Sequence, residues 1–458
     1  MVQGTSSWAG KSLLATALAR LIARRGVAVA PFKAQNMSNN ARVAEGGEIG
    51  AAQWLQARAA GVAPDVRMNP VLVKPEADDR SQVVVMGRPD LALSREPWRR
   101  RPGALWPTIR AAYESLAADH ELIVIEGAGS PAEINLSATD LANMRTARLA
   151  DARVLLVADI ERGGAFAHLY GTWALLDPPD RARLHGFVLN RFRGDSALLE
   201  PAPAMLHART GVPVLGVVPR IAHGLPDEDG AATPPVTGGR PRVAVVRYPR
   251  ASNLDELKAL EQVADVVWAT RADALAGAVL VVLPGSKHTA ADLAWLRARA
   301  IDQALGAAPR VLGICGGLQM LGAEIADPHG VEGAAVGLGL LAVRTTLGRS
   351  KTTRRTTARF ADRLPAPWAP LAGRAVGGYE IRHGRTRSDG AAPALSRDLG
   401  FASGRVLGVA LHGLLEDPEV VGALLGAAPP RSLDDELDRL ADAVAPHLDV
   451  DALLEALA

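Results

Sequence analysis

The chain contains short apolar runs of strand length, separated by segments in which apolar residues recur at helical spacing. The runs are apolar on both faces, which is typical of strands in a parallel sheet covered by helices on both sides. In the first half of the chain they lie at 27–32, 122–127, 154–159, 186–191 and 214–218. This pattern predicts an α/β fold with a parallel sheet.

A segment rich in glycine, proline and acidic residues interrupts the pattern between Asp227 and Pro241. Such a composition is typical of a linker between domains. Strand-length runs then resume at 243–247, 279–286, 311–317 and 406–413. We therefore predict two α/β domains, 1–228 and 242–458, joined by a linker at 229–241. From Leu433 the apolar residues have helical spacing, and we expect one or two helices packed against either domain.

Length and charge narrow the class of protein. A chain of 458 residues exceeds what one hydrophobic core usually supports, in agreement with two or three domains. The formal net charge of +2, with both signs scattered, excludes the positive field that nucleic-acid binding requires. The basic run from Arg349 to Arg355 is expected to be a solvated loop. No apolar run approaches the about 20 residues that span a bilayer, and no export signal precedes the first motif, so we expect a cytoplasmic protein.

Glycines and a lysine near the start form a pattern typical of a phosphate-binding loop. The segment GTSSWAGKS, from Gly4 to Ser12, precedes a helix with one apolar face. Backbone amides around Thr5 and Gly10 would surround the phosphates of ATP, Lys11 would reach the terminal phosphate, and Ser12 would bind Mg²⁺. The loop is one residue longer than usual, as in the dethiobiotin synthetase group of ATPases. A turn without a ligand is the alternative, and the Lys-Ser pair at the head of a helix argues against it.

The loop has only three residues before it, fewer than the strand that usually leads into such a loop, so we expect the natural chain to start further upstream.

Two acidic residues and a lysine are candidates for the metal and phosphate groups of the same site. Glu126 lies in the run 122–127, and open α/β sheets bind ligands at the carboxyl ends of their strands. We expect Glu126 to hold Mg²⁺ together with Ser12, and Glu48 is a further candidate ligand. Lys33 follows the run 27–32 and is expected to contact a phosphate or an acyl phosphate. Each residue taken alone would equally well be a solvated strand end.

The lone cysteine lies in a pattern typical of a catalytic nucleophile. Cys315 follows an apolar run and is bracketed by glycines before a helix, which forms a sharp turn that presents a reactive thiol. His412 lies at the end of the run 406–413, where a histidine can act as the base. The backbone amides of Gly285 and Gly316 are candidate donors to an oxyanion. This set predicts glutamine hydrolysis through a thioester, with an inert buried cysteine as the alternative.

Segments of this kind, in this order, resemble the cobyric acid synthase family of glutamine-hydrolysing corrin amidotransferases. They include GTSSWAGKS from Gly4, APFKAQNMSNN from Ala30, EGAGSPAEINL from Glu126, LPGSKHTAADLAWLR from Leu283, GICGGLQMLG from Gly313 and GYEIRHGRT from Gly378. The second half is also similar to class I glutamine amidotransferases. The resemblance places the nucleophile at Cys315, the base at His412 and the nucleotide loop at 4–12.

The resemblance implies an ATP-dependent ligase of cobalamin biosynthesis. ATP and Mg²⁺ would activate the b, d, e and g carboxylates of adenosylcobyrinic acid a,c-diamide, and ammonia from glutamine would convert them to amides, giving adenosylcobyric acid. The expected partners are therefore glutamine, ATP and a corrin precursor, without nucleic acid or a membrane, and the oligomeric state is not predicted. Gln35, Asn36, Asn135 and Asp140 are expected to face the corrin.

Three alternatives stay open. Class I amidotransferases have a glutamate two residues after the base, where this chain has Leu414, so Glu416 or another acid is expected to orient His412. The related a,c-diamide synthases share both domain types, although the segments QNM and AEINL argue against them. A partition-type P-loop ATPase with a second domain that only binds is an alternative of a different class, and the intact Cys315 and His412 argue against it.

Overall fold

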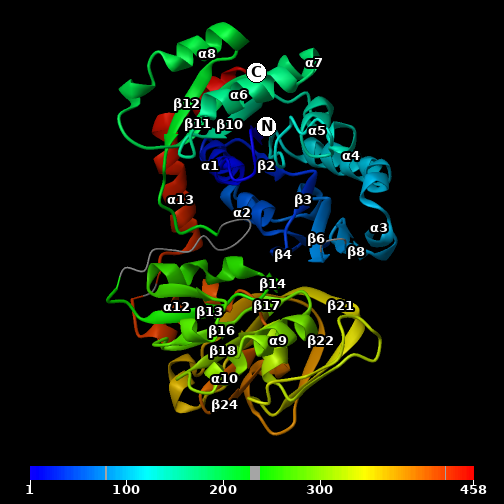
Figure 1. Ribbon diagram of the computed structural model, residues 1–458, viewed down its shortest axis with the longest axis vertical. Coiled ribbons are helices and arrows are strands. Elements are labelled where there is room, and N and C mark those ends of the chain that lie inside the picture. The colour runs from blue at the N-terminus through cyan, green and yellow to red at the C-terminus, as the bar shows by residue number, and fades with distance from the viewer. Residues whose placement is uncertain (78–79, 227–237, 429, 458) are drawn as a thin grey trace.

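The chain forms two lobes that follow one another in sequence (Figure 1). The computed structural model describes residues 1–77, 80–226, 238–428 and 430–457, so the predicted linker at 229–241 lies mostly outside the described residues. Each lobe contains a parallel sheet with helices around it, and the predicted α/β fold class is confirmed. Within the described residues, no helix is both long enough and apolar enough to cross a membrane.

The sheet of the N-terminal lobe positions the glycine-rich loop. Strand β1 (Val2–Gly4) runs parallel to β10 (Val154–Asp159), and the sheet continues through β11 (Leu184–Phe192) to β12 (Val214–Pro219). A parallel bridge between Val2 and Glu126 joins β1 to the pair formed by β9 (Leu122–Ile125) and β2 (Val29–Phe32). Consecutive residues of β10 belong to two different apolar clusters, as expected for a strand buried on both faces.

Helices from the first half of the chain accompany this sheet and contribute apolar side chains to its two flanking clusters or to a third one beneath β2 and β9. They are α1 (Lys11–Ala23), α2 (Ala51–Ala59), α4 (Arg101–Asp119), α5 (Met144–Leu149), α6 (Ala165–Leu175), α7 (Pro178–Arg181) and α8 (Ala202–Thr210).

Two small sheets extend the N-terminal lobe toward the C-terminal lobe (Figure 1). One has the order β3-β6-β7-β8, and the other is the hairpin β4-β5. Their bounds are β3 (Gln35–Met37), β4 (Ala41–Ala44), β5 (Gly47–Gly50), β6 (Val71–Ala77), β7 (Arg80–Val85) and β8 (Arg88–Asp90), with the short helix α3 (Leu91–Arg95) after β8.

The C-terminal lobe is built on a sheet with the order β15-β13-β16-β18-β25-β24-β23, of which the first five strands are parallel. These strands are β13 (Arg242–Val246), β15 (Asp265–Ala269), β16 (Leu280–Leu283), β18 (Val311–Ile314), β23 (Ala392–Leu395), β24 (Gly400–Ser403) and β25 (Val406–Val409). The helices of this lobe are α9 (Thr289–Ala298), α10 (Ile301–Leu305), α11 (Gly316–Leu321) and α12 (Pro418–Leu425), with a long 3-10 helix at Leu254–Gln262.

A second, smaller sheet of the C-terminal lobe contains the basic run. It has the order β20-β19-β21-β22, with β19 (Glu324–Ala326), β20 (Ala335–Val336), β21 (Val343–Arg359) and β22 (Ala375–Ser388), and a two-stranded pair joins β14 (Ala251–Ser252) to β17 (Gly285–Ser286). The expectation of a loop from Arg349 to Arg355 is wrong, although Arg349, Arg354 and Arg355 are exposed as expected. The run is part of β21, within which it pairs with β22 from Thr352 onward, and Lys351 binds a carboxylate of the N-terminal lobe.

The C-terminal tail returns to the N-terminal lobe. Helix α13 (Leu433–Val444) lies beside α1, and α14 (Val450–Glu455) follows it (Figure 1). Leu437, Leu440 and Val444 belong to the same buried cluster as Leu14 and Leu18 of α1. The tail therefore completes the core of the first lobe, although it follows the second lobe in sequence.

We expect Leu437→Ala to lower the free energy of unfolding of the N-terminal lobe by about 2–5 kcal/mol, because it opens a cavity at a fully buried position between α13 and α1. Urea unfolding followed by circular dichroism measures the change. Arg439→Ala, at an exposed position of the same helix, is the matched control and should stay within about 0.5 kcal/mol of the parent. Equal stability of the two variants would show that α13 is not part of this core.

Candidate active site

The glycine-rich loop between β1 and α1 is closed around the side chain of Lys11. Its ammonium donates to the backbone oxygens of Ser6 at 3.0 Å and Gly129 at 3.1 Å. Gly10 has φ +98°, and a Cβ atom there would lie 2.0 Å from Nδ2 of Asn190, which itself donates to the Ala9 oxygen at 2.8 Å. Only glycine fits this position. The lysine therefore sits where a loop of this type holds phosphate oxygens.

The structure brings Ser12, Lys33 and Glu126 together, as the sequence predicted. One carboxylate oxygen of Glu126 accepts hydrogen bonds from the Ser12 hydroxyl and the Lys33 ammonium, both at 2.8 Å. The other accepts from Gln56 Nε2 at 2.5 Å. Glu126 follows β9 and Lys33 follows β2, and these strands are parallel neighbours, so their ends meet at one edge.

The oxygen atoms of Ser12 and Glu126 suit Mg²⁺, which prefers one or two protein oxygens and takes the rest from water and phosphate. Among the residues that the structure describes, no three His, Cys, Asp or Glu side chains gather into a complete metal site. A cation at Ser12 and Glu126 would therefore depend on nucleotide phosphates for its remaining ligands.

Glu48 does not join this group, and its expected role as a metal ligand is corrected by the contacts of its carboxylate. One oxygen binds Lys74 and the other binds Lys351 of β21, both at 2.6 Å. Burial alone would raise the pKa of Glu48, but the charges of Lys351, Lys74 and Lys287 lower it well below its usual value. Glu48 therefore forms an ion pair between the lobes, in which each of its oxygens binds a lysine.

The four residues expected to face a corrin differ in exposure and in their partners. Asn36 is buried, and its amide donates to Gln53 at 2.9 Å, behind Glu126. Gln35, next to it in β3, is half-buried, whereas Asn135 is exposed. Asp140 accepts from the amides of Ala142 and Asn143 before α5, and burial raises its pKa. Asn36 and Asp140 thus have structural partners of their own.

The strand–turn–helix around Cys315 has the geometry of a nucleophile elbow. Cys315 lies between β18 and α11 with φ +50° and ψ −102°, a strained conformation that costs about 1–3 kcal/mol and is typical of such sites. A Cβ atom on Gly317 would lie 2.0 Å from the backbone oxygen of Leu283, so the turn requires glycine there. The thiol is buried at the carboxyl end of β18.

His412 lies against Cys315 and is oriented by Glu256, which the sequence had not identified. Nδ1 of His412 donates to Oε1 of Glu256 at 2.7 Å, and the other oxygen of Glu256 accepts from the Gly413 amide at 2.8 Å. Glu416, the candidate considered from the sequence, pairs with Arg42 instead. Glu256 precedes His412 by 156 residues and lies in an ordinary acidic segment, so no local signal could have found it.

Two negative neighbours determine the charge of His412. Burial by itself lowers the pKa of this imidazole, but the charges of Cys315 and Glu256, with their hydrogen bonds, raise it to about 10. Tyr379 stacks on the ring with centroids 5.3 Å apart and exchanges backbone hydrogen bonds with His412. The imidazole is therefore held as a cation in a fixed orientation beside the thiol.

The donors near the elbow differ by one residue from the expected pair. Gly285 pairs with Ser252 across β14 and β17, and the Lys287 amide donates to Arg250. Hydrogen bonds alternate along an antiparallel pair, so the Gly285 amide faces β14 and the Ser286 amide faces the elbow. A Cβ atom on Gly316 would lie 2.7 Å from the Ser286 nitrogen. The geometry therefore favours Ser286 and Gly316 as oxyanion donors, with Gly285 providing close approach.

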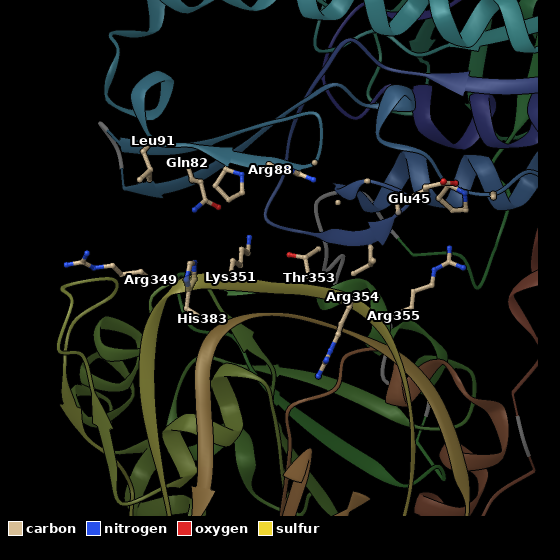
Figure 2. A pocket seen from close by; sticks show the side chains of 18 residues that line it. Glu45, Gln82, Arg88, Leu91, Arg349, Lys351, Thr353, Arg354, Arg355 and His383 are labelled. Atoms are coloured by element: carbon tan, nitrogen blue, oxygen red, sulfur yellow. The ribbon is translucent and has the colours of Figure 1, made fainter. Parts of the chain in front are cut away.

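Two cavities lie between the lobes. One, of about 940 Å³, is lined by Lys11 and Ser12 of the loop and also by Arg42, Glu256 and Glu416. The other, of about 870 Å³, lies between the strands β7 and β8 of the first lobe and the strands β21 and β22 of the second. Figure 2 shows its basic lining, in which Arg354 points away into the C-terminal lobe.

Two family models match the chain, one in each half. Residues 1–224 match the model of the CobQ/CobB/MinD/ParA nucleotide binding domain, and residues 242–420 match that of the CobB/CobQ-like glutamine amidotransferase domain. The chain is 56% identical to a cobyric acid synthase of Paracidovorax citrulli, over 97% of this chain and 96% of that one. It is 54% identical to a cobyric acid synthase of Variovorax paradoxus, over 99% and 98% respectively.

A cobyric acid synthase of a Polaromonas species is 50% identical over all of this chain and 98% of its own length. A solved glutamine amidotransferase structure covers 40% of this chain at 21% identity with a TM-score of 0.32, which adds nothing to the assignment.

The raised pKa of His412 predicts a pH dependence of stability. An unfolded histidine titrates near pH 6.5, so the stabilisation is complete below about pH 6.5 and is lost as the pH rises toward 10. The difference in free energy of unfolding between the parent and His412→Asn should therefore shrink from pH 6.5 to 10, as measured by urea unfolding. Lys287, whose pKa burial and Lys351 lower to about 8, contributes equally to both proteins and cancels. A difference that is constant with pH would contradict the ion pair.

Proposed function

This chain belongs to the cobyric acid synthase family, and we propose that it amidates the b, d, e and g carboxylates of adenosylcobyrinic acid a,c-diamide with ammonia from glutamine, at the cost of ATP. The observation that carries this proposal is the contact of Cys315 with a buried His412 that Glu256 orients, in the same chain as a phosphate-binding loop.

The thiol half of the reaction follows from the charges around His412. The Cys315 sulfur attacks the carboxamide carbon of glutamine, and the amides of Ser286 and Gly316 donate to the oxygen that becomes negative. His412 gives a proton to the departing nitrogen. Ammonia is released, and the glutamyl group remains on Cys315 as a thioester. Water then attacks the thioester, with His412 as the base, and glutamate is released. Glu256 keeps Nδ1 protonated, so that Nε2 faces the thiol and performs both transfers.

The synthetase half belongs to the N-terminal lobe. ATP lies on the loop 4–12, with Lys11 released from the Ser6 and Gly129 oxygens to bind the terminal phosphates. Mg²⁺, held at Ser12 and Glu126, would neutralise phosphate charge when bound. Lys33 binds the phosphoryl group as it passes to the corrin carboxylate, and ammonia then displaces phosphate from the acyl phosphate. ATP and glutamine are both present in the cytoplasm, and we expect this enzyme to act there.

The synthetase domain in this proposal comprises residues 1–228, and the amidotransferase domain comprises residues 242–458. Helix α13 of the tail packs in the core of the synthetase domain.

The direct test is to incubate the purified chain with ATP, Mg²⁺, glutamine and adenosylcobyrinic acid a,c-diamide and to count acid-to-amide exchanges by mass spectrometry. Exchange at each of the b, d, e and g positions is expected. A parallel incubation replaces the a,c-diamide with cobyrinic acid, and exchange only there, at the a and c positions, would identify the chain as an a,c-diamide synthase instead. Nucleotide hydrolysis without any amide product would favour an ATPase with a second domain that only binds.

Cys315→Ser should abolish glutamine-dependent synthesis and leave ammonia-dependent synthesis close to that of the parent, because acyl phosphate chemistry takes place in the other lobe. Product formation is measured with glutamine and, separately, with ammonium chloride as the nitrogen source. An equal loss with both sources would contradict the division of labour between the lobes.

Lys11→Ala should remove synthesis with either nitrogen source, since the variant lacks the cation that neutralises ATP phosphates, while basal glutaminase activity survives. Nucleotide binding by calorimetry and product formation are the measurements. Arg110→Ala, which removes an exposed ion pair in α4, serves as the control and should behave like the parent. Wild-type ATP binding by Lys11→Ala would show that the loop does not hold the phosphates.

A further inference from the structure

Arg42 belongs to the N-terminal lobe, but its guanidinium is buried in the C-terminal lobe. It lies in β4, and its side chain is 4% exposed. Nε donates to the Asp255 carboxylate at 2.6 Å, and the guanidinium also binds the carboxylate of Glu416. Trp54 of α2 covers it from behind, with the ring centroid 4.8 Å away. One cation of the first lobe thus holds two acids of the second.

Two of the groups that Arg42 contacts connect it to the surroundings of His412. Asp255 immediately precedes Glu256, the acceptor of the His412 hydrogen bond. Tyr379 lies 5.1 Å from the guanidinium on one side and stacks on the imidazole on the other. Arg42 is therefore linked to His412 directly through Tyr379 and, one residue removed, through Asp255 next to Glu256.

The neighbours of Arg42 reinforce the same attachment. Nδ2 of Asn253 donates to the Ala41 oxygen at 2.7 Å and to the Tyr379 hydroxyl at 3.0 Å. The amide of Leu254 donates to Oδ1 of Asn40 at 3.1 Å. The segment 40–42 of one lobe therefore holds the segment 253–256 of the other by its backbone and by its side chains.

We propose that Arg42 is a positioning residue of the glutaminase site, supplied across the lobe interface, which keeps Glu256 and Tyr379 in the arrangement that aligns His412 with Cys315. Without Arg42, Asp255 and Glu416 would lose their cation in a buried place beside Glu256, and the segment 253–256 would move to separate the acids. A shift of about 1 Å in a catalytic group can cost about 10²-fold in rate. Lysine replaces arginine poorly here, since it lacks the planar fork that binds two acids and stacks on two rings.

The inference rests on the proposed glutaminase activity, and the test uses the full chain. Arg42→Gln should reduce the glutaminase kcat by about 10- to 100-fold, with the KM for glutamine within about twofold, because the reacting groups are misaligned while the glutamine pocket is intact. Arg42→Lys should recover part of the loss. Synthesis from ammonium chloride should remain near the parent value in both variants.

A second measurement reports on the thiol without any substrate. The rate of Cys315 alkylation by iodoacetamide, followed from pH 5 to 10, depends on the charge of His412. In the parent, alkylation should be fast, because His412 lies against the thiol and can accept its proton. In Arg42→Gln, where the imidazole is no longer aligned with the thiol, the rate should fall across this pH range.

Lys351→Gln is the matched control, because it also removes a buried ion pair between the lobes, with Glu48, but has no contact with the segment 253–256. It should keep the parent's glutaminase kcat and alkylation profile, with a similar loss of thermal stability. Parent-like kcat and alkylation in Arg42→Gln would overturn the proposal, as would an equal loss in Lys351→Gln, which would assign the effect to docking of the lobes in general. If the parent itself hydrolysed no glutamine, the proposed function would fail, and the alkylation profiles would still decide the role of Arg42.

Discussion

The hydrogen bond from His412 to Glu256 is the interaction on which the thiol site depends. An imidazole buried to this degree loses its proton readily unless negative charge surrounds it, and Cys315 and Glu256 supply that charge on opposite sides of the ring. The arrangement requires three elements to meet: the elbow after β18, the turn after β25 and the 3-10 helix after β14. The seven-stranded sheet places the first two side by side, since β18 and β25 are parallel neighbours. Its topology thereby determines where the chemistry can occur.

The third element is positioned from outside the lobe. Residues 253–256 contact the N-terminal lobe through Arg42, and a second buried ionic cluster, Lys74–Glu48–Lys351, lies elsewhere in the interface. Buried ion pairs are seldom more stabilising than apolar side chains of the same size, since desolvation offsets much of their attraction. Their value here lies in geometry. A carboxylate bound by two lysines can form in few relative arrangements of the lobes. An apolar patch would allow one lobe to slide over the other.

The parts of the fold and the site that could be predicted from the sequence are those with local signatures. The loop at 4–12 and the elbow at Cys315 each combine a buried strand, small residues at a turn and a following helix, all within a dozen residues. Glu126 and His412 were identified by their positions at strand ends. Glu256 was not, because an acid within a 3-10 helix has no pattern that separates it from a solvated acid, and its partner is far away in sequence.

The errors have the same physical origin. Glu48 looked like a metal ligand because its charge suited one, but the lysines that neutralise it come from β6 and from β21 of the other lobe. The run from Arg349 to Arg355 looked like a loop because its partners are remote in sequence: β22 pairs with its strand, and Glu48 of the other lobe binds Lys351. Whether a charged side chain can be buried depends on its ion-pair partner. When that partner lies in the other lobe, the spacing of residues along the sequence does not reveal it.

The path of the chain restrains the two lobes further. It enters the C-terminal lobe after β12 and leaves again between α12 and α13, and α13 is then anchored to α1 by buried leucines and by ion pairs such as Arg20–Asp438 at 2.7 Å. Two connections hold a pair of domains at a higher effective concentration than one, because rotation about either is limited by the other. Ammonia released at Cys315 is a nucleophile only while it is unprotonated and within reach of the acyl phosphate. A doubly connected, ionically fixed interface is suited to that requirement, because it limits movement around the cavity that both Lys11 and Arg42 line.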